Sequence, residues 1–254
     1  MAILAKFRHF PSLNNECYES SNKIFKDFCQ LSFGKNLYSN EYQRLFMKIV
    51  FSNIPMKKLE DKPLHYPVDG NKSIEYDGKV MFPINAVLAT SIKKGERVKV
   101  VEFTTKDEKG CWKKNISSFE SELKLLNRGI GAELEFVPII EDFVEDKITH
   151  EKRFKSLIDT IENDADIIVD ITYGPKTLPL ILFSALAFSE KFFNANIQNI
   201  IYAKINYDTD NNIIEGSQKI YDITSLYYLN SLTTAMDAPD GETAKKMMDN
   251  FFKL

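Results

Sequence analysis

The stretch "DIIVDITYGPKTLPLILFSALAF", residues 166–188, places an apolar run, a polar turn and a second apolar run in direct succession. Its first part, 166–172, is almost entirely apolar, as expected of a central strand in a parallel sheet. Pro179 suits the first turn of a helix, which we expect to continue to about Phe193. The stretch therefore predicts a strand, a corner and a helix.

The same alternation extends outward through the chain. We expect strands at 45–51, 97–103, 132–140, 166–172 and 199–207, and helices at 83–96, 117–131, 149–163 and 179–193. Ser117 and Glu120 have the spacing of a capping box at the start of one helix, and Gly129 suits its exit. The segment 213–224 can return beside the preceding strand as a hairpin. This order predicts an α/β fold with an open, mostly parallel sheet and a C-terminal β-hairpin.

The chain divides into three parts by its pattern. Residues 1–46 form an N-terminal extension of unknown role, in which 22–33 has the spacing of an amphipathic helix. Residues 47–225 contain the alternating strands and helices, with a turn-rich loop at 64–79. Residues 226–254 are expected to form a short helical tail.

The composition of the 254 residues limits the function classes. A net charge of −3 argues against a surface that binds duplex nucleic acid. The three cysteines, Cys17, Cys29 and Cys111, form no CxxC pair and predict reduced thiols in the cytoplasm. The start of the sequence lacks the apolar region of a signal peptide, and the run at 178–188 is too short to span a bilayer, so we expect no membrane segment.

The corner after the strand at 166–172 carries groups that suit an anion. It offers hydroxyls, a flexible glycine and a cation, from Thr172, Tyr173, Gly174, Lys176 and Thr177. A helix that begins here adds backbone N–H groups and the positive end of its dipole. The alternative is a plain turn, in which Asp170 or Thr172 caps the helix and Lys176 is solvated.

A second corner follows the first strand of the domain, at "SNIPMKK". Ser52 and Asn53 lie where this strand is expected to end, and the lysines Lys57, Lys58, Lys62 and Lys72 follow in a flexible stretch. Because ligands of open α/β sheets bind outside the carboxyl ends of the strands, both corners are candidates for one site. The alternative for this corner is a solvated loop.

At these residues the sequence resembles the CARF domains, the ligand-sensing domains of type III CRISPR systems. The residues that match the signature of that family are Asp170, Thr172, Tyr173, Gly174, Lys176, Thr177 and Pro179. Pro175 stands where the family often has an aromatic residue. The likeness covers about residues 47–225.

The resemblance implies a homodimer of Rossmann-like domains whose strand ends face one pocket. That pocket would bind a cyclic oligoadenylate, most often cyclic tetra-adenylate. Lys176, Ser52 and Thr172 would then carry the chemistry, and the other residues of the two corners would contact the ligand: Asn53, Asp170, Tyr173, Gly174, Pro175 and Thr177.

Two roles remain open for such a domain. It is either a ring nuclease, in which the ribose 2′-OH attacks the adjacent phosphate without a metal, or a sensor that acts through a separate effector. No arginine precedes a histidine at the spacing of a HEPN ribonuclease, and no cofactor or zinc site is expected. Glu145 and Lys147 in "EDFVEDK" are faintly similar to a metal-dependent nuclease motif, but we interpret this segment as a charged, solvated loop.

Overall fold

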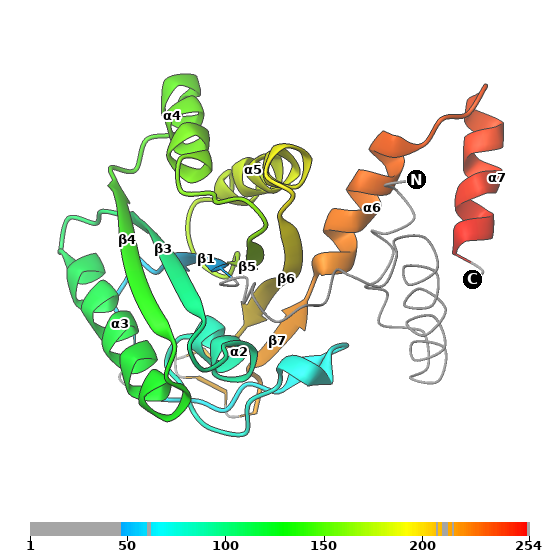
Figure 1. Cartoon of the computed structure of the whole chain (residues 1–254). Coiled ribbons are helices and arrows are strands. Elements are labelled where there is room, and N and C mark those ends of the chain that lie inside the picture. The colour runs from blue at the N-terminus through cyan, green and yellow to red at the C-terminus, as the bar shows by residue number, and fades with distance from the viewer. Residues whose placement is uncertain (1–46, 60–61, 207, 210–212, 215, 253–254) are drawn as a thin grey trace, which may run out of the picture.

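The computed structural model describes residues 47–59, 62–206, 208–209, 213–214 and 216–252. The helix expected at 22–33, with the rest of the N-terminal extension, lies outside these residues. The described part confirms the predicted α/β class and forms a Rossmann-like open sheet (Figure 1).

The sheet has the strand order β2-β7-β6-β5-β1-β3-β4. Every neighbouring pair is parallel except β6 and β7, which form the predicted antiparallel hairpin. The strands are β1 (Met47–Ile54), β2 (Val68–Asp69), β3 (Arg97–Thr105), β4 (Glu133–Glu141), β5 (Asp166–Asp170), β6 (Asn196–Lys204) and β7 (Lys219–Asp222). The strand of the opening motif, β5, is therefore central, which explains its apolar sequence.

Helices cover both faces of this sheet (Figure 1). One face carries α2 and α3, and the other carries α4 and α5, with α6 beside β6. The helices are α2 (Pro83–Ser91), α3 (Cys111–Ile130), α4 (Lys147–Ile158), α5 (Leu178–Phe192), α6 (Thr224–Ala235) and α7 (Gly241–Phe251). The predicted tail is thus helical, in two pieces, and none of the described residues of α7 is buried.

Two apolar cores result from the alternation of side chains along the strands. In β1, Val50 joins the core beneath α2 and α3, whereas its neighbours Ile49 and Phe51 join the core beneath α4 and α5. Because the strands are in register, β5 repeats this division with Ile168 on one side and Val169 on the other. The sheet is therefore buried on both faces.

The boundaries of α3 differ from the sequence prediction. The helix begins at Cys111, after Gly110 in a left-handed conformation, so the expected capping box at Ser117 lies inside the helix. Asn115 explains the earlier start, because its Nδ2 donates to the carbonyl oxygens of Pro55 and Lys57 and holds the first turns against the end of β1. The helix ends at Ile130 with Gly131 as its cap, so Gly129 lies inside the last turn and is not the exit.

The turn-rich segment at 64–79 is not only a loop. It contains β2 and a 3-10 helix, η2 (Lys72–Ile74). Val68 pairs in parallel with Ile220 of β7, about 150 residues later in the chain, so local sequence alone could not indicate this strand.

Candidate functional site

The structure brings the two predicted corners together at the carboxyl edge of the sheet. Asn53 Nδ2, near the end of β1, donates a hydrogen bond to the carbonyl oxygen of Tyr173 at 3.0 Å. Gly174 has a φ of +96°, and a Cβ on it would lie 3.3 Å from Leu178 Cδ2 and 3.6 Å from Asn53. A glycine is therefore favoured here, chiefly by the backbone angle and also by the tight contact that a Cβ would make with Leu178.

Ser52 and Asn53 lie in the strand itself, because β1 extends to Ile54 and not only to the predicted Phe51. Both residues are buried, at 1% and 2% exposure. β1 pairs with β5 on one side and with β3 on the other. The pairing with β3 continues beyond the last residue of β5, and this explains the extension of β1.

Asp170 and Thr172 shape the corner rather than cap the helix. Asp170 Oδ1 accepts a hydrogen bond from the Thr172 backbone N–H at 2.8 Å, and Thr172 Oγ1 accepts one from the Ala203 N–H at 2.9 Å. The residue before α5 is Thr177, whose side chain makes no capping hydrogen bond. Burial raises the pKa of Asp170 to about 6, although interactions of its carboxylate with the side chain and the backbone N–H of Thr172 oppose this rise.

A row of buried polar residues crosses three neighbouring strands at this edge. Asp170, Ser52 and Glu102 are aligned in register on β5, β1 and β3, and none is more than 1% exposed. Side chains in register on parallel strands point to the same face, here toward α2 and α3. Sequence reasoning missed Glu102, although an acid within the apolar strand "RVKVVEF" was a visible signal.

Glu102 lies in unusual surroundings for a carboxyl group. Neither of its side-chain oxygens has a hydrogen-bond partner among the described residues. Burial raises its pKa to about 8, with a further rise from Glu120 and an opposing effect from Lys124. Glu102 is therefore largely protonated at neutral pH, as expected for a desolvated acid.

The helix start offers less to an anion than the sequence suggests. The N–H of Leu178 donates to the carbonyl oxygen of Pro175 at 3.1 Å, and the N–H of Leu180 donates to that of Thr177 at 3.1 Å. Pro179 has no N–H. Pro175 is buried, and Lys176 is exposed, so the Lys176 side chain is the positively charged group that this corner presents to solvent.

Glu145 brings the segment between β4 and α4 to the same corner. Its carboxylate accepts a hydrogen bond from Thr177 Oγ1 and one from Arg153 Nη1 at 2.7 Å, and His150 Nε2 lies 3.2 Å away. Burial alone would raise the pKa of Glu145, but these contacts outweigh it and hold the pKa below its usual value. Residues 142–146 are an exposed connection, as the interpretation of "EDFVEDK" as a charged, solvated loop expects, but the Glu145 carboxylate also makes these contacts at the corner.

Arg153 is the second residue that sequence reasoning missed. Its side chain is fully buried, and its Nε donates to Glu141 Oε2, at the end of β4, at 2.9 Å. The guanidinium also lies over the ring of Phe103 on β3. Arg153 was hidden because it lies in a charged stretch, "HEKRFK", that suggests a solvated helix face.

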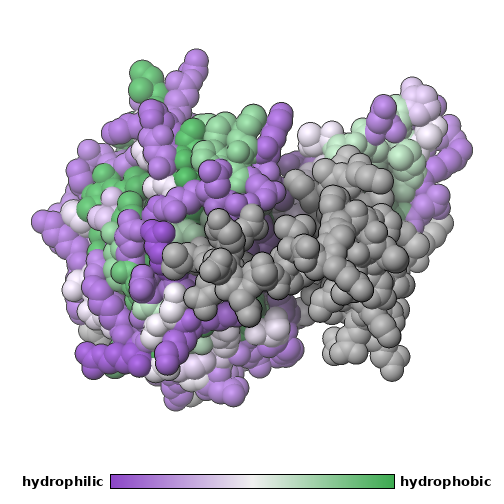
Figure 2. Space-filling model, in the orientation of Figure 1, coloured by the Kyte–Doolittle hydropathy of each residue, from purple (hydrophilic) through white to green (hydrophobic). Residues whose placement is uncertain are grey.

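An apolar surface adjoins the corner. The side chains of this surface lie in β4, in the connection to α4, in the first turn of α4 and in α5, and they are Ile140, Phe143, Val144, Ile148 and Leu180. Figure 2 shows apolar atoms among hydrophilic ones over this part of the molecule. Exposed apolar residues gathered in this way are typical of a contact surface for another protein.

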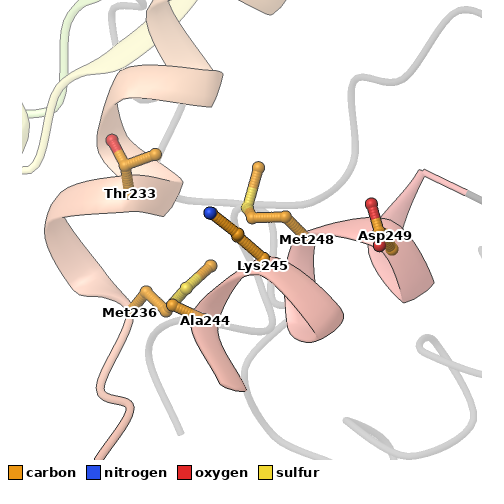
Figure 3. A pocket seen from close by; sticks show the side chains of 6 residues that line it. All are labelled: Thr233, Met236, Ala244, Lys245, Met248 and Asp249. Atoms are coloured by element: carbon orange, nitrogen blue, oxygen red, sulfur yellow. The ribbon is translucent and has the colours of Figure 1, made fainter. Parts of the chain in front are cut away.

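A separate hollow lies between α6 and α7, away from the sheet edge (Figure 3). Its lining is mostly apolar and consists of Thr233, Met236, Ala244, Lys245, Met248 and Asp249.

Within the described residues, metal ligands do not identify this site, and neither does a known family. Among the described residues, no group of three or more His, Cys, Asp or Glu side chains is arranged to hold a metal ion. No helix in the described part of the chain combines the length and apolar character needed to cross a membrane. No family model matches the sequence, and no curated protein matches it significantly.

Proposed function

We propose that the protein binds a cyclic oligoadenylate, with cyclic tetra-adenylate as the first ligand to test, and slowly cleaves it in the cytoplasm as part of type III CRISPR defence. The observation that carries this proposal is the junction of Asn53 with Tyr173, which joins the two corners beside the exposed Lys176. A cation and hydroxyls at the carboxyl edge of a parallel sheet suit a phosphate ligand. The resemblance of this corner to CARF domains supplies the class of ligand.

The proposal includes a homodimer around the ligand. A ring of identical nucleotides is matched best by two identical surfaces related by a two-fold axis. The apolar surface around Phe143 and Ile148 borders the corner and is suited to meet a second copy of itself.

The proposed chemistry needs no metal. The ribose 2′-oxygen forms a bond to the adjacent phosphorus and loses its proton to solvent, and the bond from phosphorus to the 5′-oxygen breaks. The products are a 2′,3′-cyclic phosphate and a 5′-hydroxyl that takes up a proton. Lys176 stabilises the negative charge that grows on the phosphate, and Ser52 and Thr172 position the ribose and the phosphate.

The test is to incubate the pure protein with cyclic tetra-adenylate and EDTA and to separate the products by chromatography. Linear products that disappear in Lys176→Ala support the ring nuclease. Lys191→Ala is the matched control, because it removes the same charge from the last turn of α5, at the opposite end of the helix. Cleavage that survives in Lys176→Ala would contradict the assigned role of this lysine.

A sensor without catalysis is the second candidate. The exposed helix α7 and the apolar hollow beside it favour this function, because they provide a surface on which an effector protein can bind. Tight binding of cyclic tetra-adenylate that leaves the ligand intact would support the sensor. Failure to bind any cyclic oligoadenylate would exclude both functions.

A further inference from the structure

The carboxylate of Glu145 occupies the place beside Thr177 where a ligand anion is expected. Its Oε1 accepts from Arg153 Nη1 at 2.7 Å, and its Oε2 accepts from Thr177 Oγ1, with His150 Nε2 at 3.2 Å. Hydroxyl, guanidinium and imidazole groups are the donors that proteins also use for phosphate. The chain has therefore built an anion site and filled it with its own carboxylate.

Thr177 cannot serve Glu145 and a phosphate at the same time. A hydroxyl has one proton to donate, and in this structure that proton is directed to Glu145. The oxygens of an ionised phosphate diester only accept hydrogen bonds. The predicted contact between Thr177 and a ligand phosphate therefore requires Glu145 to leave.

Arg153 retains donors for such an exchange. Its Nε is bonded to Glu141, and its Nη1 to Glu145, but its Nη2 has no partner among the described residues although the side chain is fully buried. Departure of Glu145 frees Nη1, and the two terminal nitrogens, which share one edge of the guanidinium, then have no partner among the described residues. That edge matches two oxygens of a phosphate.

The position of Glu145 allows it to move without unfolding α4. Residues 142–146 are exposed and connect β4 to the helix. The helix has its own cap, because Asp146 Oδ1 accepts a hydrogen bond from the Thr149 N–H at 2.7 Å. Glu141 remains paired with Arg153, so the buried arginine keeps one acidic partner when Glu145 leaves.

We infer that Glu145 is an internal placeholder for the ligand phosphate, and that ligand binding displaces it from Thr177 and Arg153. Arg153 is then a ligand-binding residue that is covered in the free protein. This inference rests on the proposed function for the identity of the ligand. In this arrangement Glu145 weakens the binding of every anion at this corner. It therefore raises the ligand concentration that is needed for binding.

The test compares affinities of Glu145→Ala, Glu145→Gln and the wild-type protein by titration calorimetry. Glu151→Ala is the matched control, since it removes the same charge from the neighbouring helix α4, where Glu151 lies beside the exposed Lys147. The probes are cyclic tetra-adenylate and inorganic pyrophosphate. For Glu145→Ala we expect binding of both probes to tighten about tenfold, because charged hydrogen bonds to Glu145 no longer compete. Glu151→Ala should stay within about twofold.

A second substitution tests the role of Arg153. In the Glu145→Ala background, Arg153→Lys keeps the positive charge but loses the forked geometry, so we expect most of the gained affinity to disappear. Thermal unfolding of each variant verifies that it is folded. If Glu145→Ala does not fold, Glu145→Gln carries the test, with a smaller gain because its amide oxygen still accepts from Thr177.

The outcomes separate this inference from the proposed function. Unchanged or weaker binding of both probes in the folded Glu145 variants overturns the placeholder, and so does a complete absence of binding in all proteins. Tighter pyrophosphate binding without any binding of cyclic tetra-adenylate upholds the placeholder and rejects the proposed ligand. An equal gain in Glu151→Ala shows a general effect of charge and also overturns it.

Discussion

Among the described residues, polar side chains at the amino edge of the central sheet are bonded to one another, whereas many buried polar atoms at the carboxyl edge are not. At the amino edge, Lys48 Nζ lies 3.2 Å from Glu96 Oε1 and donates to Gln198 Oε1 at 3.0 Å. Gln198 and Asn196 in turn donate to Asp166 at 2.7 and 2.8 Å. These groups come from the starts of several parallel strands, and they satisfy one another within the fold.

At the carboxyl edge, many buried polar atoms have no partner among the described residues. They include side-chain atoms at the ends of three strands and in α4, and they belong to Asn53, Glu102, Thr104, Thr105, Glu141 and Arg153. The remaining atoms of this kind in the described chain belong to Asn85 in α2 and to Gln218, which precedes β7 beside the carboxyl end of β6. Because an unpaired buried polar group destabilises a fold, its presence at one edge indicates that this edge is shaped for something other than stability.

The comparison predicts the largest loss of stability at the amino edge. Lys48→Met leaves the buried carboxylate of Glu96 without its cation, so we expect the free energy of unfolding to fall by about 3–5 kcal/mol in urea denaturation. The double variant Lys48→Met, Glu96→Gln removes the unpaired charge and should recover most of this loss. A loss below about 1 kcal/mol in the single variant would show that the amino edge is not the better satisfied one.

Glu102 should make stability depend on pH. Its pKa is raised from 4.5 to about 8, so between these pH values the folded protein keeps a proton that the unfolded chain has released. Stability therefore falls as the pH rises, by about 1.4 kcal/mol per pH unit. From pH 5 to pH 8 we expect the wild-type protein to lose roughly 3 kcal/mol relative to Glu102→Gln in urea denaturation.

The control for this measurement is Glu135→Gln, which changes an exposed glutamate on the adjacent strand β4. The free energy of unfolding of Glu135→Gln should depend on pH in the same way as that of the wild-type protein. If Glu102→Gln follows that dependence as well, Glu102 is ionised in the fold, and the carboxyl edge is less desolvated than its burial indicates.

Gly174→Ala probes the contact between the two corners. Alanine is strained at a φ of +96°, and its Cβ would make a tight contact with Leu178, so we expect the free energy of unfolding to fall by about 1–2 kcal/mol. Gly241→Ala is the control, because nothing lies within 4 Å of its added Cβ and its φ is not in the left-handed range. Equal midpoints for both variants in urea would mean that the corner is not held tightly.

The smallest effect on stability should come from Lys176→Ala. The side chain is exposed at the corner, so we expect the free energy of unfolding to change by less than about 0.5 kcal/mol. Binding of cyclic tetra-adenylate should nevertheless weaken about tenfold or more, since a charged contact to phosphate is lost. A large loss of stability with unchanged binding of cyclic tetra-adenylate would mean that Lys176 stabilises the fold and does not bind the ligand. The carboxyl edge would then not be the binding edge of the sheet.

Much of the fold could be predicted from the sequence because its signals are local. The apolar run before Asp170 and the proline at 179 indicate a strand and a helix without knowledge of the rest of the chain. The start of α3 could not be found in this way, because Asn115 is held by the carbonyl oxygens of Pro55 and Lys57, about 60 residues earlier. Long-range contacts of this kind override local capping signals.

The candidate site shows the same division. The sequence by itself determined that a glycine, hydroxyls and Lys176 stand between a buried strand and a helix, since this follows from their order in the chain. Only the tertiary structure decided that Glu102 aligns with Ser52 and Asp170, and that Glu145 links Thr177 to Arg153. Strand register and helix packing bring these residues together although they are far apart in the sequence, and local sequence patterns cannot predict such contacts.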